Sequence, residues 1–266
     1  MSGLDTVDTA TIDAQIDLDG MRHQYERDGV AYIPSVFGKA EMDRLRLFAF
    51  EQLGHLGMQK HYRSGERIQS TGPECWPSIW FWPSISTGWF EKVRTGTRIQ
   101  SIVQHILGDD VRQLNNQLYF RMQGDGDAFN WHQDCVFRKG MSESFDPGTD
   151  YLQTVIAIDR VNSRNGGLQF QPGVTRDLEL GREDLRGVTP ADIKAPGRYE
   201  YSLMPGDMLI WNAYTPHASG QNWSDRGRMT YMNGFAKASG CQTGIWPDYL
   251  VDGEIAEVDP ERIPYA

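Results

Sequence analysis

The sequence has few cysteines and no long apolar run, and these absences exclude several classes of protein. Its 266 residues include three cysteines, which lie far apart and form no CxxC pair. We therefore expect neither a disulfide framework nor a cysteine-based structural zinc site, and free thiols favour a cytoplasmic location. No apolar stretch approaches the roughly 18 residues that cross a bilayer, and no signal-peptide core is present, so we expect no membrane partner.

Positive charge is scarce as well. Lysine and arginine total 26 against 36 aspartate and glutamate residues, which gives a formal net charge of −10, and no basic run occurs. Nucleic acid is polyanionic and would be repelled at long range, so we expect no nucleic-acid partner. Hydrophobic residues make up 39% of the chain and charged residues 23%, which is typical of a folded globular protein rather than a disordered one.

Hydrophobic periodicity predicts helices first and strands afterwards. Helical spacing indicates helices over 17–27, 39–53 and 95–107, with a short strand at 30–34. Segment 55–90 carries Pro and Gly punctuation and reads as irregular. Beyond residue 110 the pattern alternates, and it predicts strands at 114–122, 151–158, 168–171, 199–203, 207–211 and 228–235.

This order of elements indicates the fold class. We expect a mainly β fold with flanking helices, built around a double-stranded β-helix, the jelly-roll barrel of cupin-like proteins. We expect a single domain over 1–266, with N-terminal helices over about 17–110, a barrel core over about 111–236 and a C-terminal cap over 237–266. A barrel of this kind can bring side chains that are far apart in the sequence to one point.

Two short motifs carry the side chains best suited to hold a metal ion. In Trp131-His132-Gln133-Asp134, a β-strand would point His132 and Asp134 to the same side, because side chains alternate along a strand. His217 follows an apolar strand and would add a second imidazole. Two imidazoles and one carboxylate on one face of an octahedral ion leave open positions, which is typical of non-haem Fe(II) oxygenases. His132, Asp134 and His217 are therefore candidate metal ligands and the candidate catalytic centre.

An arginine on a later strand provides a second signal, which is needed because His-x-Asp alone is common by chance. Arg228 opens an apolar strand, where an unpaired charge is costly. Its guanidinium matches a carboxylate bidentately, so a dicarboxylate cosubstrate would be a suitable partner. A structural salt bridge to a carboxylate of the protein is the alternative.

Taken in order, these motifs resemble the phytanoyl-CoA dioxygenase family of Fe(II)/2-oxoglutarate-dependent oxygenases. The resemblance extends from about residue 20 to 235 and includes an N-terminal Asp-Gly-Val-Ala-Tyr-Ile-Pro stretch. The segments that carry it are 28–34, 131–134, 165–173, 205–207, 217–220 and Arg228.

The resemblance implies a complete oxygenase site. His132, Asp134 and His217 would bind Fe(II), and 2-oxoglutarate and O2 would be the cosubstrates. Arg228, eleven residues after His217, would pair with the distal carboxylate of 2-oxoglutarate. Halogenating relatives have a small residue where this chain has Asp134, so halogenation is disfavoured.

Three further residues gain a role only from the resemblance. Ser219 would assist at the distal carboxylate of the cosubstrate. Gln133 and Gln117 would contact the cosubstrate or support the metal ligands. Two departures from the family pattern concern the pocket rather than the metal: Val174-Thr175-Arg176 stands where Ser-His is frequent, and the strand near Val155 lacks an aromatic residue.

The substrate is indicated only by the aromatic content. Segment 76–90 is rich in tryptophan and phenylalanine, and together with loop 135–150 it could border the iron. Core packing is an equally good explanation of these aromatics. We expect a bulky, partly apolar small molecule, oxidised in a tailoring step of secondary metabolism such as antibiotic biosynthesis, by hydroxylation, epimerisation, cyclisation or desaturation. The alternative is a metal-binding cupin-like isomerase or a small-molecule binding barrel that performs no oxidation.

Overall fold

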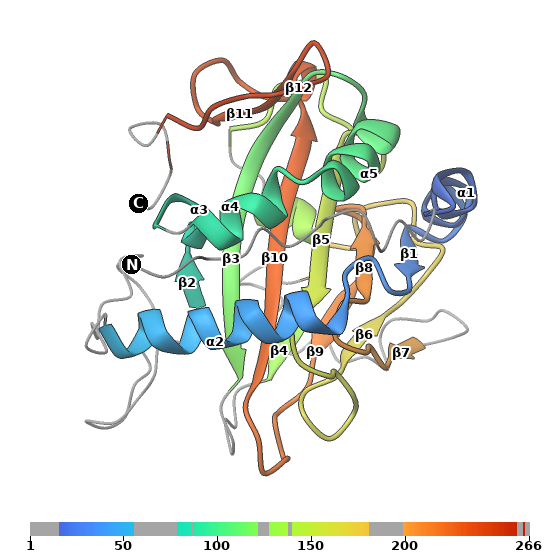
Figure 1. Cartoon of the computed structure of the whole chain (residues 1–266). Helices are drawn as coiled ribbons and strands as arrows, with labels where there is room; N and C mark the ends of the chain where they lie inside the picture. The colour runs from blue at the N-terminus through green and yellow to red at the C-terminus, as the bar shows by residue number, and fades with distance from the viewer. Residues whose placement is uncertain are drawn as a thin grey trace, which may run out of the picture.

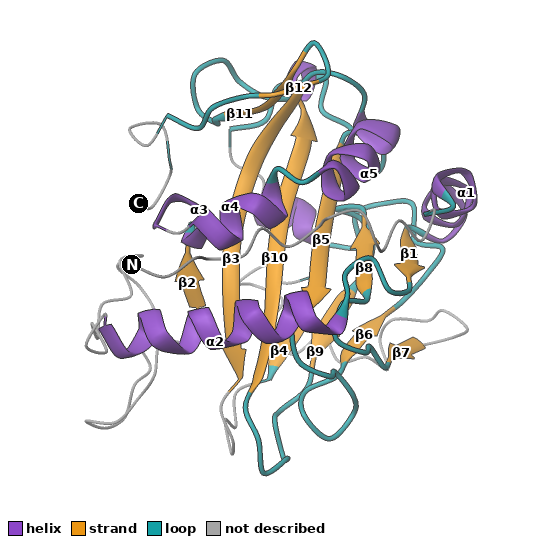
Figure 2. Ribbon diagram, in the orientation of Figure 1, coloured by secondary structure: helices purple, strands orange, loops and turns teal. Residues whose placement is uncertain are grey.

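The computed structural model describes residues 16–55, 79–86, 88–121, 128–137, 140–180, 199–259 and 263. Within these ranges the chain forms two antiparallel sheets, and helices lie against one face of the larger sheet (Figure 1 and Figure 2). The prediction of a mainly β fold with flanking helices is therefore confirmed.

The larger sheet forms the scaffold. Among the described residues its strand order is β1-β8-β5-β10-β3-β11-β12, and β2 also pairs with β3. Strand β10 lies in the middle and is hydrogen-bonded to β3 on one side and to β5 on the other. The strands are β1 (Val30–Ile33), β2 (Ile79–Phe81), β3 (Val111–Arg121), β5 (Tyr151–Ala157), β8 (Met208–Trp211), β10 (Arg228–Lys237), β11 (Asp248–Val251) and β12 (Glu254–Ile255).

The smaller sheet contains the two histidines of the metal motifs, His132 and His217. Its order is β4-β9-β6-β7, with the strands β4 (Phe129–His132), β6 (Leu168–Phe170), β7 (Tyr199–Tyr201) and β9 (His217–Ser219). Two short 3-10 helices, η2 (Asp134–Phe137) and η4 (Ala238–Gly240), follow β4 and β10. Because β4 and β9 are neighbours, the two histidine-bearing segments lie side by side in this sheet.

The alternation of side chains along the strands creates two separate cores. On the outer face of the larger sheet, Leu118, Ile156, Ile210 and Tyr231 pack against the helices. On the inner face a second cluster, which includes Val155 and Trp211, fills the space toward the smaller sheet. The helices are α1 (Leu18–Asp28), α2 (Lys39–His55), α3 (Pro83–Ser86), α4 (Gly88–Arg94) and α5 (Thr97–Leu107).

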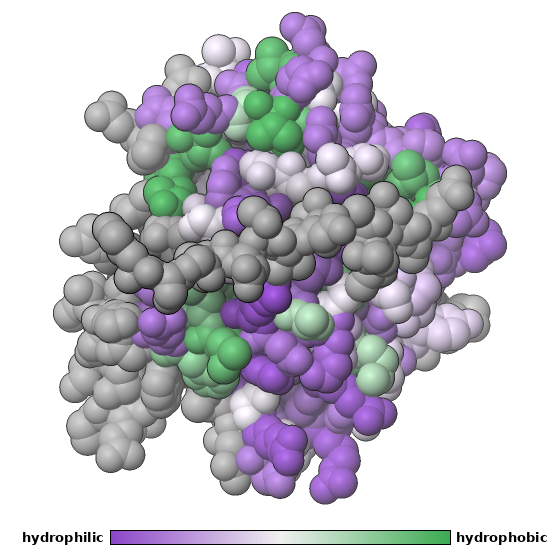
Figure 3. Space-filling model, viewed as in Figure 1, coloured by the Kyte–Doolittle hydropathy of each residue, from purple (hydrophilic) through white to green (hydrophobic). Residues whose placement is uncertain are grey.

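Helices α1 and α5 begin or pack as their sequences predict. Asp17 is the N-cap of α1 and accepts a hydrogen bond of 2.9 Å from the Gly20 backbone N–H. In α5 the apolar residues at helical spacing are all buried. In the described part of the chain, no helix combines the length and the apolar character needed to cross a membrane. Where Figure 3 colours this face by hydropathy, hydrophilic residues predominate and hydrophobic residues lie in scattered groups.

Several local predictions need correction. Segment 55–90 reads as irregular, yet β2, α3 and the first turn of α4 lie in it. In α2 helical spacing predicts an apolar stripe of Met42, Leu45, Leu47, Phe48 and Leu53. Met42 and Leu45 are buried, but Leu47 is 67% exposed. Strands β11 and β12 form within segment 237–266 and extend the larger sheet beyond β3. Other residues of that segment pack near the start of β5, so the tail also covers part of the space between the sheets.

Gly206 makes the turn before β8 and provides a test of the fold. Its φ is +94°, and a Cβ there would lie 1.9 Å from the backbone oxygen of Phe37. Gly206→Ala should therefore lower the free energy of unfolding by about 3 kcal/mol or more, because both backbone strain and a backbone clash arise. Urea denaturation measures this loss.

Gly244→Ala is the matched control for this test. Gly244 also has a positive φ of +82°, but a Cβ there meets nothing within 4 Å. It should cost only about 1 kcal/mol, from strain alone. Equal losses in the two variants would contradict the close approach of Gly206 to Phe37.

Candidate metal centre

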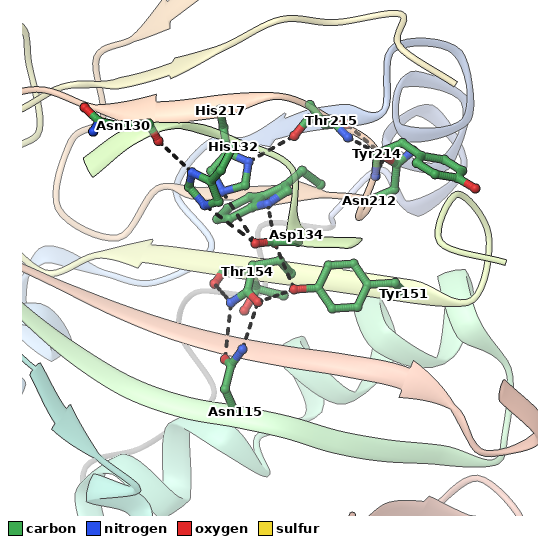
Figure 4. A network of polar contacts seen from close by, with 12 residues as sticks. Asn115, Asn130, His132, Asp134, Tyr151, Thr154, Asn212, Tyr214, Thr215 and His217 are labelled. Carbon is green, nitrogen blue, oxygen red and sulfur yellow. Dashed lines mark hydrogen bonds and ion pairs between the residues drawn. The ribbon is translucent and has the colours of Figure 1, made fainter. Parts of the chain in front are cut away.

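Three buried polar side chains meet between the two sheets (Figure 4). The Nε2 atoms of His132 and His217 lie 3.8 Å and 3.7 Å from Oδ1 of Asp134. One potential ligand atom from each residue lies within 4.8 Å of the other two. Each residue is at most 7% exposed. The structure thus brings together the three candidate ligands in a space that matches one metal ion.

The strands place the two histidines, but a helical turn places the aspartate. His132 ends β4 and is paired in register with His217, which begins β9, so their ring centroids are 4.1 Å apart. Asp134 does not lie on the strand, because β4 ends at His132 and η2 begins at Asp134. The expected same-face arrangement on a strand is therefore wrong in its geometry. The carboxylate reaches the imidazoles because the chain turns at Gln133.

Backbone carbonyl groups fix the protonation pattern of both imidazoles. Nδ1 of His132 lies 2.8 Å from the Asn130 oxygen, and Nδ1 of His217 lies 2.9 Å from the Thr215 oxygen. A carbonyl oxygen can only accept, so each Nδ1 carries the hydrogen and donates it. In the neutral imidazole each Nε2 then keeps its lone pair, and it faces Asp134. This is the tautomer that binds a metal through Nε2.

Two buried donors hold the carboxylate of Asp134. The Tyr151 hydroxyl is 2.9 Å and the Trp211 indole N–H is 3.0 Å from Oδ2. Oδ1 therefore remains directed at the two histidines. The Tyr151 hydroxyl also lies 2.6 Å from Oε1 of Gln153, which is 3.0 Å from Nδ2 of Asn115. Two imidazole nitrogens and one carboxylate oxygen, each oriented by its own hydrogen bond, fit a divalent iron ion.

Sequence reasoning did not identify Tyr151 or Trp211. One signal was available, since Trp211 ends an apolar strand and a buried indole N–H needs an acceptor. Tyr151 had no comparable signal, because its partner Asp134 is contributed by a different segment.

Removal of the Tyr151 hydroxyl should weaken metal binding without removing a ligand. Tyr151→Phe should lower the affinity for Fe(II) by roughly 10- to 100-fold, because an outer hydrogen bond to the ligand is lost. Anaerobic competition with a chromogenic chelator measures this affinity. Tyr32→Phe is the control, since its hydroxyl bonds to Asp207 instead. An unchanged affinity in Tyr151→Phe would show that Trp211 alone orients the carboxylate.

Two buried arginines lie side by side at one end of the space between the sheets. Arg228 and Arg121 are directly paired in the register of β10 and β3. Nη1 of Arg228 donates to the Gly166 oxygen, and Nη2 of Arg121 donates to Oγ of Ser219 at 2.8 Å. Arg228 is 3% exposed and Arg121 9%. Arg121 was missed as a candidate, although it shares the inward-facing row of β3 with Gln117.

A close approach of two glycines forms the wall beside these arginines. Gly166 has a φ of +86°, and a Cβ there would lie 2.7 Å from the Gly220 oxygen and 3.6 Å from Nη1 of Arg228. A larger residue at 166 would therefore displace either the backbone or the guanidinium.

The two glutamines have different surroundings. Gln117 is half-buried on the inner face of β3, and its Oε1 accepts from the Tyr119 hydroxyl at 3.1 Å. Gln133 is fully buried. Its Nε2 donates to the backbone oxygens of Arg176 and Tyr214 at 2.9 Å and 2.6 Å, and its Oε1 accepts from the Leu178 N–H at 2.6 Å. Gln133 thus connects three segments, and its contact with a cosubstrate stays a prediction.

The aromatic residues of segment 76–90 do not all serve the same purpose. Residues 76–78 lie outside the described ranges. Trp80 packs edge-on against Phe90 at 6.0 Å, in the core beneath the helices. Phe81 is paired with Gln117 and so belongs to the inward-facing row. Trp89 is 38% exposed on α4. Core packing therefore accounts for part of the segment, and Phe81 alone of these four points toward the space between the sheets.

Cys241 lacks the properties of a nucleophile. It is buried, and burial raises the pKa of its thiol to about 11. A thiol with such a pKa is protonated at neutral pH and is unreactive.

Comparison with known proteins gives a consistent result. A family model described as phytanoyl-CoA dioxygenase matches residues 25–230. A 2-aminoethylphosphonate dioxygenase from uncultured bacterium HF130_AEPn_1 is 25% identical over 136 residues, which are 50% of this chain and 48% of that protein. The chain thus spans about half the length of this curated relative.

Solved structures share the fold at low identity. The epimerase SnoN, in complex with Fe3+, α-ketoglutarate and nogalamycin RO, aligns with a TM-score of 0.67 at 20% identity, over 91% of this chain and 96% of SnoN. The non-heme monooxygenase ThoJ, as its Ni complex, aligns with a TM-score of 0.67 at 17% identity, over 91% and 89%. EctD from S. alaskensis with bound Fe gives 0.65 at 18% identity, over 89% and 80%. At these identities the likeness shows a common jelly-roll fold.

Proposed function

The chain belongs to the phytanoyl-CoA dioxygenase family, and from this premise we propose that it oxidises a C–H bond of a small organic molecule at an iron held by His132, Asp134 and His217. It is a 2-oxoglutarate-dependent dioxygenase, with Fe(II) as cofactor and 2-oxoglutarate and O2 as cosubstrates. When bound, the iron supplies the oxidising chemistry, in which 2-oxoglutarate is converted to succinate and CO2 as the substrate is oxidised.

One observation carries the proposal. Both imidazoles donate Nδ1–H to backbone carbonyls, and both Nε2 atoms face the same oxygen of Asp134 at less than 4 Å. Two lone pairs and one carboxylate oxygen in a buried space would be costly without a cation between them. The three side chains cover only one side of such an ion, so positions remain for the cosubstrates.

The surrounding residues would prepare the site for 2-oxoglutarate. Arg228 would pair with the distal carboxylate, with Ser219 as a further donor and Arg121 beside it. Gln117, on the same inward-facing row as Arg121, would contact the cosubstrate nearer the iron. The buried ring of Trp211 would exclude water on the side of His217 while its N–H holds Asp134.

We propose a bulky, partly apolar substrate and a tailoring step in secondary metabolism. The fold-level likeness to the epimerase SnoN and the carbocyclase SnoK of nogalamycin biosynthesis supports this context. Hydroxylation, epimerisation and ring closure all begin with oxidation of a C–H bond, so one site can serve each of them. A single catalytic domain and a cytoplasmic location complete the proposal.

An anaerobic titration tests the cofactor assignment directly. Addition of Fe(II) and 2-oxoglutarate to the purified protein should produce the visible charge-transfer band of the iron chelate, and admission of O2 should then yield succinate. Iron binding without this band would overturn the oxygenase proposal. In that case a metal-dependent isomerase or a binding barrel would become the better explanation.

A further inference from the structure

The two imidazoles of the metal centre have opposite surroundings. His217 contacts Phe170, whose ring is stacked at 5.7 Å, and Trp211 at 5.0 Å. Both of these partners are buried, at 0% and 1% exposure. His132 also contacts two aromatic rings, Phe129 at 4.6 Å and Phe137 at 5.6 Å, with both pairs in edge-type geometry. These two rings, however, are 42% and 51% exposed.

The chain places these exposed rings on both sides of the metal motif. Phe129 begins β4, three residues before His132, and Phe137 ends η2, three residues after Asp134. Both rings are therefore fixed by the same short segment that supplies two of the proposed ligands. His132 and His217 are equally buried, at 6% each, so the two sides of the centre differ in their aromatic neighbours, and the exposed rings lie beside His132.

Exposure of two phenyl rings at this point has an energetic consequence. A phenylalanine side chain is stabilised when it is removed from water, and each of these two rings leaves about half of its surface in water. A ligand that covers both rings recovers this stabilisation. The rings offer neither a charge nor a hydrogen-bond donor, and aromatic pairs in stacked or edge geometry are stronger than area alone predicts.

We propose that Phe129 and Phe137 form the substrate-binding surface of the metal centre, and that they select a substrate with a planar, unsaturated ring system. The ring lies against the two phenyl groups and thereby holds a neighbouring C–H bond beside the metal, on the side of His132. This inference rests on the proposed function, because it assigns a substrate class to the same site.

Binding of a planar probe and its saturated counterpart tests the proposal. The probes are naphthalene-2-methanol and decahydronaphthalene-2-methanol, which share a skeleton and a hydroxyl group but differ in planarity. Calorimetric titration of the anaerobic protein, loaded with Fe(II) and 2-oxoglutarate, gives the dissociation constants. The planar probe should bind more tightly than the saturated one. Phe129→Leu and Phe137→Leu should each weaken binding of the planar probe about two- to tenfold.

Phe50→Leu is the matched control. Phe50 is similarly exposed, at 47%, but lies on α2, against the outer face of the larger sheet. It should leave the affinity for the planar probe unchanged. The proposal is overturned if the wild-type protein does not prefer the planar probe, or if both leucine variants bind it as the wild-type protein does.

The charge-transfer band, recorded on the same samples, separates this proposal from the one it rests on. A normal band with no loss of probe affinity in the leucine variants rejects the substrate surface and leaves the oxygenase assignment intact. Absence of the band in the wild-type protein rejects the oxygenase assignment itself.

Discussion

Replacement of His217 by alanine should abolish the charge-transfer band and the conversion of 2-oxoglutarate to succinate. Two donors would remain, and the carboxylate of Asp134 would face one imidazole instead of two. Loss of an outer partner typically costs 10- to 100-fold in metal affinity, and loss of a ligand should exceed roughly 100-fold. Metal content after gel filtration and anaerobic absorbance titration both measure the effect.

The control must separate loss of a ligand from loss of packing. His217 contacts Phe170 and Trp211, so alanine also leaves a small cavity. His217→Gln keeps most of the volume and should lose the band as well. His105→Ala, on α5, removes a histidine outside the centre and should retain the band. A band of normal intensity in His217→Gln would refute the assignment of this residue as a ligand.

Arg228→Ala should weaken 2-oxoglutarate binding more than any other change outside the metal ligands. The guanidinium is 3% exposed, and removal of one partner from a buried charge pair costs about 3–5 kcal/mol, or roughly two to three and a half orders of magnitude in the dissociation constant. The loss of affinity is measured by the concentration of 2-oxoglutarate at which the charge-transfer absorbance reaches half of its maximum. Iron content should stay normal, because Arg228 is not among the clustered ligand residues.

Arg226→Ala is the matched control for this change. It removes an arginine two positions away that is exposed, so 2-oxoglutarate binding should be unchanged. Arg121→Ala is informative as well, because Arg121 lies opposite Arg228 and holds Ser219. If Arg121→Ala lost 2-oxoglutarate binding while Arg228→Ala kept it, Arg121 rather than Arg228 would be the partner of the distal carboxylate.

The elements that the sequence predicted well are those with a local signal. Periodicity placed α1, α2, α5 and the long strands within a few residues, because a buried face repeats along one element. Two short motifs made His132, Asp134 and His217 candidate ligands, and the structure brings the three side chains together. The predicted path between His132 and Asp134 was wrong, since alternation on a strand was assumed and the chain instead turns at Gln133. That turn depends on bonds to Arg176, Leu178 and Tyr214, which no local pattern reveals.

The missed residues are those whose role depends on a distant partner. Tyr151 and Trp211 are important because Asp134 reaches them, and Arg121 because its register places it beside Arg228. Such pairings come from sheet topology rather than from neighbouring sequence. The short strand β11 was missed for the same reason, because its pairing with β3 joins segments more than a hundred residues apart.

The central position of β10 has a consequence for biosynthesis of the protein. On the ribosome the chain emerges from its N-terminus, so β3 and β5 are complete long before β10 appears at residues 228–237. Until β10 inserts between them, each presents an unpaired edge of hydrogen-bonding groups. The nascent chain is thus most prone to association during this interval. Because His217 is synthesised shortly before β10, all three ligands are available to iron only near the end of the interval.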